Sequence, residues 1–494
     1  MFSAIKSVSK DSIVYGLGGL LGKGIGFLLI PLYTHYLMAA EYGILELLDL
    51  TTYIIGLLLA MGIAQSVVRY YYEYEDQKRK DQVISIAMLT IWGISAVFLP
   101  ILIIYSSEIS DLVHDSSEFS GFFVLVFITM IINLSNEIPM TLFRIKQQST
   151  LYVSVSLSKL AISLMLNILL ITQYNMGIKG ILIAGLTSSS LAGIFLTAYT
   201  LRKTKISWSF SVLKEMISYS FPLAWSWFGM FILHFGDRFL LQRLDSLGSV
   251  GIYSLAYKFG MMGNVLILSP FMMAWAPKRF EIVNDTDAKK TYAYVFTYFV
   301  LALIYVSLGI AILIKDVIVI VADQQYHSAY MYVPTILAAY IFYGIYSYVQ
   351  FGILIKKKTK YLGFCTLAVS VVNIALNYLF IPILNVWGAT LVTFISFFLL
   401  AVTIYPIAQK LYHIPYQFGR LAKMAVLAIG LFFLASFIEL EPIMLSLGVK
   451  FIIALSYPLL LHLTRFYTTD EIAKLVEIRQ QLFRIVKHWL WFSK

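Results

Sequence analysis

The chain has 494 residues, of which 60% are hydrophobic and only 13% are charged, and its formal net charge is +11. Soluble domains carry about 25% charged residues, so this composition excludes an ordinary soluble protein and indicates an integral membrane protein. The single cysteine, Cys365, excludes an internal disulfide and a cluster of thiolate metal ligands.

Fourteen apolar stretches are each long enough to cross a bilayer as a helix, so the sequence predicts an all-α membrane protein with about 14 transmembrane helices. No small-residue cleavage pattern precedes the first stretch, and we expect it to be a retained anchor. In chain order the predicted spans are residues 12–37, 43–68, 83–106, 119–143, 151–172, 178–201, 213–236, 250–275, 291–314, 329–355, 360–381, 386–409, 420–438 and 442–466.

The charges of the predicted loops alternate along the chain. Basic segments such as RYYYEYEDQKRK (69–80) and IKKKTK (355–360) alternate with poorly basic or acidic ones such as SSEISDLVHDSSE (106–118). Because short basic loops stay on the cytoplasmic side, we expect both chain termini in the cytoplasm. The net positive charge therefore indicates topology and not nucleic-acid binding.

Short motifs recur at nearly one offset, which indicates an internal duplication. IKQQST (145–150) returns as IKKKTK (355–360), and EYGILELL (41–48) returns as SVGIYSLA (249–256). The buried-type asparagines Asn167 and Asn377 lie in similar apolar settings. Six spans in each copy make the two repeats parallel, related by an axis along the membrane normal. Such repeats favour alternating access, with a static scaffold or channel as the alternative.

The predicted organisation has four parts. Two six-helix lobes occupy residues 1–206 and 207–412, and two further transmembrane helices occupy residues 413–466. Residues 467–494 form a cationic amphipathic helix on the cytoplasmic leaflet, which begins at a capping box of Thr468 and Glu471.

Three lysines within predicted spans are candidate substrate-binding residues, because a charge inside the membrane usually faces a cavity or a partner. Lys23 is too deep to reach the interface and lies beside glycines that leave it room, although a structural ion pair is the alternative. Lys159 could contact substrate or pair with Glu137 of the preceding span. Lys258 is near enough to the outer end of its span for partial snorkelling.

Four oxygen-bearing residues of the second repeat are candidate ligands for a hard cation such as Na⁺. They are Asp237, Asn373, Asn377 and Thr393. The alternative is that the asparagines form hydrogen bonds between helices, as polar residues in membranes often do. His114 lies among acidic residues in a predicted outer loop, and a solvated loop explains that group better than an active site does.

Several motifs together resemble one known family. They are G-x-G-F-L-L-x-P-L-Y-T-x-Y-L (24–37) followed by E-Y-G (41–43), R-Y-Y-x-E (69–73), D-R-F-L-L (237–241), V-G-I-Y-S-L-A-Y-K (250–258) and A-W-A-P (274–277). This combination is similar to the polysaccharide-transport branch of the multidrug/oligosaccharidyl-lipid/polysaccharide exporter superfamily, which includes Wzx-type flippases of O-antigen, lipopolysaccharide and capsule repeat units.

The resemblance implies two lobes facing each other in a V and a place in the bacterial inner membrane. It implies a flippase that moves an undecaprenyl-diphosphate-linked glycan from the cytoplasmic to the periplasmic leaflet, with a polysaccharide polymerase and chain-length machinery as partners. By the same resemblance Lys23 matches a phosphate-binding position. Asp237, Asn373, Asn377 and Thr393 match a Na⁺ site in which Asn377 replaces a carboxylate. Lys450 suits the implied lipid-tail groove only if it faces protein or a head group.

The energy source and the competing functions follow from what the chain contains. It has no G-x-x-x-x-G-K-[ST] loop, so we expect no cofactor and no ATP hydrolysis in the chain, and no ATPase subunit is evident. Transport would be driven by Na⁺, by H⁺ or by consumption of the flipped product. The alternatives are a cation-coupled multidrug antiporter and, less favoured, a membrane-embedded polysaccharide polymerase or ligase. The outer segments are too short to hold the second substrate of a polymerase or ligase, so we expect no enzyme activity.

Overall fold

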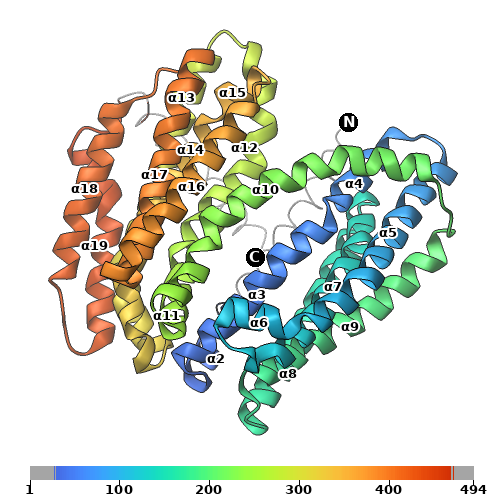
Figure 1. Cartoon of the computed structure of the whole chain (residues 1–494). Coiled ribbons are helices and arrows are strands. Elements are labelled where there is room, and N and C mark those ends of the chain that lie inside the picture. Colours follow the sequence, from blue (N-terminus) through green and yellow to red (C-terminus); the bar gives the residue numbers. More distant parts are fainter. Residues whose placement is uncertain (1–26, 28, 469–470, 472–494) are drawn as a thin grey trace, which may run out of the picture. The chain divides into compact units, whose positions relative to one another are not determined.

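The computed structural model of the chain describes residue 27, residues 29–468 and residue 471, and its regular structure there is entirely helical (Figure 1). In chain order the α-helices are α2 (Ile30–Tyr36), α3 (Ala39–Ala60), α4 (Ile63–Glu73), α5 (Gln77–Ile104), α6 (Ser106–His114), α7 (Ser120–Ile145), α8 (Ser149–Ile168), α9 (Gly177–Lys203), α10 (Phe210–Leu244), α11 (Leu247–Gly260), α12 (Ser269–Glu281), α13 (Ala288–Val321), α14 (Val333–Val349), α15 (Phe351–Ile355), α16 (Lys360–Leu384), α17 (Val386–Leu411), α18 (Phe418–Ser436) and α19 (Ile443–Leu463). Short 3₁₀ or π segments are η1 (Ser117–Phe119), η2 (Leu169–Gln173), η3 (Asn264–Leu268), η4 (Ile282–Asn284) and η5 (Gln324–Met331).

Twelve helices of the described part of the chain are long and apolar enough to cross a membrane. Each coincides with one of the fourteen predicted spans, so the prediction of an all-helical, multi-pass membrane protein is confirmed. The first predicted span, residues 12–37, lies mostly outside the described residues. The seventh, residues 213–236, is helical as part of α10, but α10 is not among the twelve because several serine, tyrosine and tryptophan side chains make it less apolar.

The long helices satisfy their polar groups internally, as a bilayer requires. Serine and threonine hydroxyls inside the helices donate to carbonyls one turn back, as Thr51 does to Leu47 at 2.7 Å. At the start of α5 the Asp76 carboxylate accepts a hydrogen bond from the backbone amide of Arg79 at 3.3 Å. The predicted capping box is also present, since the Thr468 amide donates to the Glu471 carboxylate at 2.7 Å.

The chain divides into two compact units. Unit 1 comprises the described parts of Met1–Tyr257 together with Ile318–Tyr332 and Gly363–Ser396. Unit 2 comprises Lys258–Val317, Val333–Leu362 and the described parts of Phe397–Lys494. The predicted lobes at 1–206 and 207–412 follow the internal repeat rather than this division, and they stay a prediction.

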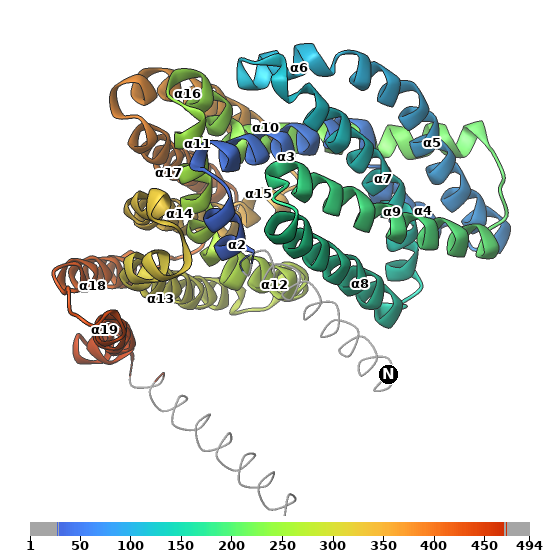
Figure 2. The ribbon, with the colours of Figure 1, turned by 90° about the horizontal axis from the view of Figure 1, so that it is seen from below.

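Unit 1 is built around helices α3 to α11. An apolar cluster formed by α4, α5, α7 and the first turns of α10 includes Val67, Ile86, Leu142 and Met216, all almost completely buried. Helix α10 contacts α3, α4, α5 and α6, so it packs along much of this group of helices. Figure 2 shows α7, α8 and α9 side by side on the same flank. This packing gives the polar side chains described below a fixed frame.

The first turns of α3 and α11 make the closest backbone contact in unit 1. A methyl group built on Gly43 would lie 2.1 Å from the carbonyl oxygen of Leu247, and one built on Gly251 would lie 1.9 Å from that of Ala39. The two contacts are equivalent under the internal repeat. Ala39 corresponds to Leu247 and Gly43 to Gly251, each 208 residues apart, which is the offset of the repeated motif. Only glycine allows the two helices to approach so closely.

Hydrogen bonds from the second repeat surround this glycine contact. The backbone amide of Ala39 donates to Gln325 at 3.0 Å, and the Tyr326 hydroxyl donates to the carbonyl of Leu37 at 3.0 Å. The Gln242 amide donates to the Asp115 carboxylate at 3.0 Å. All these residues lie at the predicted outer ends of their helices, so the two repeats are joined there within unit 1.

Unit 2 has an aromatic core and a peripheral helix pair. Rings of α12, α13 and α14 stack closely, with Phe271 and Phe299 at 4.3 Å between centroids and Trp275 and Tyr348 at 6.1 Å. Helices α18 and α19 run side by side as a hairpin (Figures 1 and 2). On α18, Arg420 makes two hydrogen bonds of 2.9 Å to Glu471, which fixes the chain just after α19.

Candidate functional site

Asp237 on α10 is the centre of a buried polar cluster in unit 1. Its side chain is almost completely buried. One carboxylate oxygen accepts a hydrogen bond from Arg238 at 2.8 Å, and the other accepts from the Tyr253 hydroxyl at 2.5 Å and from the Thr393 hydroxyl at 3.0 Å. Three helices, α10, α11 and α17, therefore converge on one carboxylate.

Arg238, the next residue on α10, supplies the positive charge of the cluster. It is 1% exposed, and its guanidinium lies over the rings of Tyr257 at 3.9 Å and Tyr253 at 5.1 Å. Besides Asp237 it faces a second carboxylate, since its Nε lies 3.6 Å from Glu46 of α3. An unpaired buried charge would be strongly destabilising, so this arginine and Asp237 stabilise each other.

Asn373 and Asn377 of α16 form a second pair. The Asn377 amide donates to the side-chain oxygen of Asn373 at 3.1 Å, and the Asn373 amide donates to the Ser396 hydroxyl at 2.9 Å. Thr393 and Ser396 are one helical turn apart on α17. The Asp237–Arg238 pair, through Thr393, and the asparagine pair, through Ser396, therefore contact adjacent turns of the same helix. The side-chain oxygen of Asn377 is buried and has no hydrogen-bond partner.

Of the four predicted cation ligands, Asp237 and Asn373 thus contact adjacent turns of α17, which carries Thr393, and Asn377 contacts Asn373. Their carboxylate, amide and hydroxyl oxygens are of the kind that suits Na⁺. The free oxygen of Asn377 fits such an ion. The Asp237 carboxylate fits less well, because Arg238 and two hydroxyls already donate to it and a cation would have to share it with a guanidinium. Within the described residues no three His, Cys, Asp or Glu side chains are arranged to hold a metal.

The three predicted substrate-binding lysines stay a prediction, and two of them lie in the described part of the chain. Lys23 lies outside the described residues. Lys159 on α8 donates to the Asn133 side chain of α7 at 2.7 Å and forms no ion pair with Glu137, because the register of the two helices places it one turn away. Lys258, half-buried, lies near the end of α11.

Lys450 and Arg238 form buried ion pairs that were not predicted from the sequence. In unit 2 Lys450 of α19 forms an ion pair of 2.7 Å with Asp316 of α13, and the Ser446 hydroxyl donates to the same carboxylate at 3.0 Å. Lys450 therefore faces protein, which was one of its two predicted settings. The pairing of Arg238 with Asp237 was also missed, although two opposite charges side by side at the end of a predicted span are a signal of mutual compensation.

The expectation of a solvated loop at His114 is wrong. Its ring is 4% exposed and packs against Phe119 at 5.2 Å and Phe123 at 5.5 Å between centroids. The α6 helix folds back toward α3, so that Nε2 lies 3.4 Å from the carbonyl oxygen of Ile44. Burial lowers the pKa of His114 to about 4, which makes it a neutral structural residue at neutral pH.

Comparison with known proteins gives one family and one fold. A profile of the family described as "Polysaccharide biosynthesis protein" matches residues 8–283, more than half of the chain. No curated protein sequence matches the chain. The inward closed conformation of the lipid II flippase MurJ is 15% identical over 92% of this chain and 99% of that chain, with a TM-score of 0.73. An inward-facing multidrug resistance MATE family transporter of the MOP superfamily is 14% identical over 81% of this chain and 94% of its own, with a TM-score of 0.62.

Proposed function

We propose, from the fact that the chain belongs to the polysaccharide biosynthesis protein family, that it is a flippase for undecaprenyl-diphosphate-linked oligosaccharide. It would move O-antigen, capsule or exopolysaccharide repeat units from the cytoplasmic to the periplasmic leaflet of a bacterial inner membrane. The observation that carries this proposal is the fold of a lipid II flippase along 92% of the chain, combined with a family of polysaccharide biosynthesis. Family and fold are those of transporters in the MOP superfamily and not of enzymes.

Alternating access between the two six-helix repeats is the proposed mechanism. The reciprocal contact of Gly43 and Gly251 supports it, because equivalent residues touch each other only near a symmetry axis. The hydrogen bonds of Gln325 and Tyr326 to the start of α3 would have to break when the outer side opens. A few such bonds, each worth about 1 kcal/mol net, are weak enough for a transporter to break in each cycle.

Substrate recognition is proposed to rest on charge. A diphosphate cannot cross hydrocarbon without counter-charges, since burying an unpaired ion is unfavourable by at least several kcal/mol. Lys23, Lys159 and Lys258 are the proposed counter-charges within the spans. The transported group would be the lipid-linked glycan, and a polymerase and chain-length machinery would receive it on the outer side.

A cation-coupled multidrug antiporter is the second candidate, because MATE transporters share the fold. Export of organic cations needs a cavity carboxylate that is free to bind them. The buried Asp237 already has Arg238 as its counter-ion, which favours the lipid diphosphate over a cationic drug.

The test is a flipping assay with the purified chain in vesicles that contain fluorescent undecaprenyl-diphosphate oligosaccharide. We expect protein-dependent loss of label from one leaflet, and no transport of organic cations under the same ion gradients. In cells, Lys23→Gln should cause lipid-linked oligosaccharide to accumulate in the cytoplasmic leaflet, whereas Lys23→Arg should keep substantial transport. Normal surface polysaccharide from a stably expressed Lys23→Gln protein would exclude the proposed role of this lysine.

A further inference from the structure

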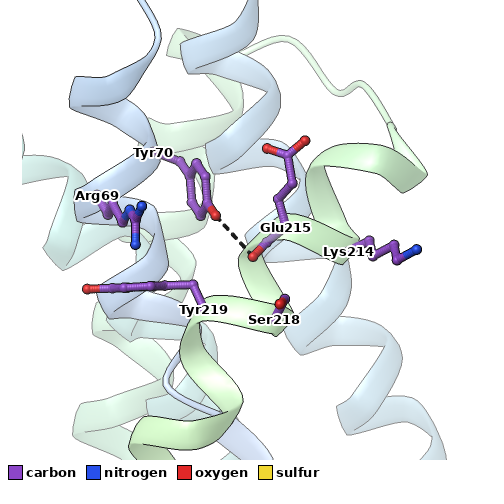
Figure 3. A pocket seen from close by; sticks show the side chains of 6 residues that line it. All are labelled: Arg69, Tyr70, Lys214, Glu215, Ser218 and Tyr219. Carbon is purple, nitrogen blue, oxygen red and sulfur yellow. Dashed lines mark hydrogen bonds between the residues drawn. The ribbon is translucent and has the colours of Figure 1, made fainter.

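A pocket of about 370 Å³ lies between the end of α4 and the start of α10 in unit 1. Figure 3 shows its lining: Arg69 and Tyr70 from α4, and Lys214, Glu215, Ser218 and Tyr219 from α10. We call it the Arg69 pocket. None of these residues belongs to the Asp237 cluster, and the proposed transport mechanism does not use them.

The frame of the Arg69 pocket is fixed by two tyrosines that bind one glutamate. The Tyr70 hydroxyl donates to the backbone oxygen of Glu215 at 3.1 Å, and the Tyr74 hydroxyl donates to its carboxylate at 2.9 Å. Burial and the bond to Glu215 raise the pKa of Tyr74 to about 12, so it remains a donor. Figure 3 shows the Glu215 carboxylate turned away from Arg69, which leaves the interior of the pocket without a facing anion.

Arg69 is held in place but keeps donors available. Its guanidinium lies 4.4 Å from the ring centre of Tyr219 and 5.5 Å from that of Tyr70. Its Nε is 3.4 Å from Glu73, in an ion pair whose side chains are 49% and 51% exposed and which is therefore weak. Among the described residues, none accepts a hydrogen bond from its two terminal amino groups. A stacked, planar guanidinium with two free amino groups is suited to bidentate binding of phosphate.

Two further side chains add to this chemistry. Lys214 is exposed and makes no ion pair with any described residue, and its side chain points outward, away from Arg69, at the rim of the pocket (Figure 3). Ser218, also exposed, offers a hydroxyl donor on the pocket wall. The pocket therefore combines a stacked guanidinium and a hydroxyl with a lysine at its rim, which is the chemistry of a phosphate ester site.

The depth of the pocket indicates where the phosphate comes from. Arg69 is four residues before the end of the membrane-length helix Ala39–Glu73, at its predicted cytoplasmic end. Tyr70 contacts the rings of Tyr74 and Tyr219 there, and Tyr71 contacts that of Tyr72, an enrichment in tyrosine that is typical of the membrane–water interface. Lipid phosphates lie at this level, and anionic lipids give the cytoplasmic surface a negative potential.

We propose that the Arg69 pocket binds the phosphate of a lipid head group in the cytoplasmic leaflet. The phosphate oxygens accept hydrogen bonds from the terminal amino groups of Arg69 and from the Ser218 hydroxyl, while Lys214 supplies positive potential at the rim. The lipid is either a bulk anionic phospholipid or a lipid-linked diphosphate. The site stands independently of the proposed transport function.

The experiment measures lipid binding to the purified full chain by native mass spectrometry with phosphatidylglycerol, undecaprenyl diphosphate and inorganic phosphate as probes. Arg69→Gln should weaken phosphatidylglycerol binding about tenfold, as loss of a charge-assisted pair would. Arg79→Gln is the matched control, since Arg79 also stacks on a tyrosine, Tyr74, at 5.4 Å but lies outside the pocket. It should leave binding unchanged.

The remaining outcomes either support or overturn the proposal. Tighter binding of undecaprenyl diphosphate than of phosphatidylglycerol would support it with the lipid-linked diphosphate as ligand, and equal or weaker binding would support it with bulk phospholipid. Displacement of lipid by inorganic phosphate at equal concentration would overturn it, as would equal loss in Arg69→Gln and Arg79→Gln. Ser218→Glu places an anion on the exposed wall near Arg69, where it would compete with a phosphate, and undiminished lipid binding by that variant would also overturn the proposal.

Discussion

Gly43 and Gly251 hold equivalent positions in the two repeats, and each packs against the first carbonyl of the helix that carries the other. Such reciprocity is the mark of a two-fold contact. Here it joins α3 and α11 at the predicted outer end of the membrane, where any opening of the repeats must separate these two turns.

The first prediction concerns Gly251→Ala. A new methyl group would meet the Ala39 carbonyl, so the helices must move apart at a destabilisation of about 1–3 kcal/mol. We expect a lower melting temperature in detergent and faster hydrogen exchange around residues 39–43 and 247–251. The control is Gly248→Ala on the same helix, where the nearest atom is 3.9 Å away. Equal effects of both variants would contradict a close-contact role for Gly251.

The second prediction concerns sodium. Because Asp237 is shared with Arg238 and Asn377 is neutral, we expect only modest stabilisation of the protein by Na⁺ relative to K⁺ or choline. Asn377→Asp adds a carboxylate and should increase the Na⁺-specific rise in melting temperature, whereas Asp237→Asn should abolish it. If the three salts give the same melting temperature for all these proteins, no Na⁺ site exists at this cluster.

Much of the fold was predictable, because a bilayer demands long apolar helices and these are visible in the sequence. The grouping of Asp237 with Thr393 was predicted from oxygen-bearing side chains within the second repeat, and the family resemblance implied the same set. The partner of Lys450 could not be predicted, because Asp316 is 134 residues away in the sequence. No nearby residue indicates which side of α13 the Asp316 side chain faces. The Lys159–Glu137 alternative failed for the same reason, because helix register decides which of two turns a lysine meets.

The third prediction concerns the buried pair of Asp316 and Lys450. Removing one partner leaves an uncompensated charge, which typically destabilises a protein by about 3–5 kcal/mol. We therefore expect Lys450→Met alone to lower the melting temperature strongly and to loosen α19. The double variant Asp316→Leu with Lys450→Met should recover most of the loss, because no unpaired ion remains. Additive losses in the double variant would show that the pair contributes net stability instead.

The last prediction concerns pH and His114. Its pKa of about 4 in the folded protein is below the ordinary value near 6.5, so the unfolded chain binds the proton more readily. The stabilisation is complete above about pH 6.5 and is lost as the pH falls toward 4, amounting to about 2 kcal/mol between pH 7 and pH 5. His114→Gln should flatten the dependence of the melting temperature on pH over this range. His413→Gln, which removes an exposed histidine, should leave it unchanged. A pH profile that is the same in all three proteins would mean that protonation of His114 is not coupled to unfolding.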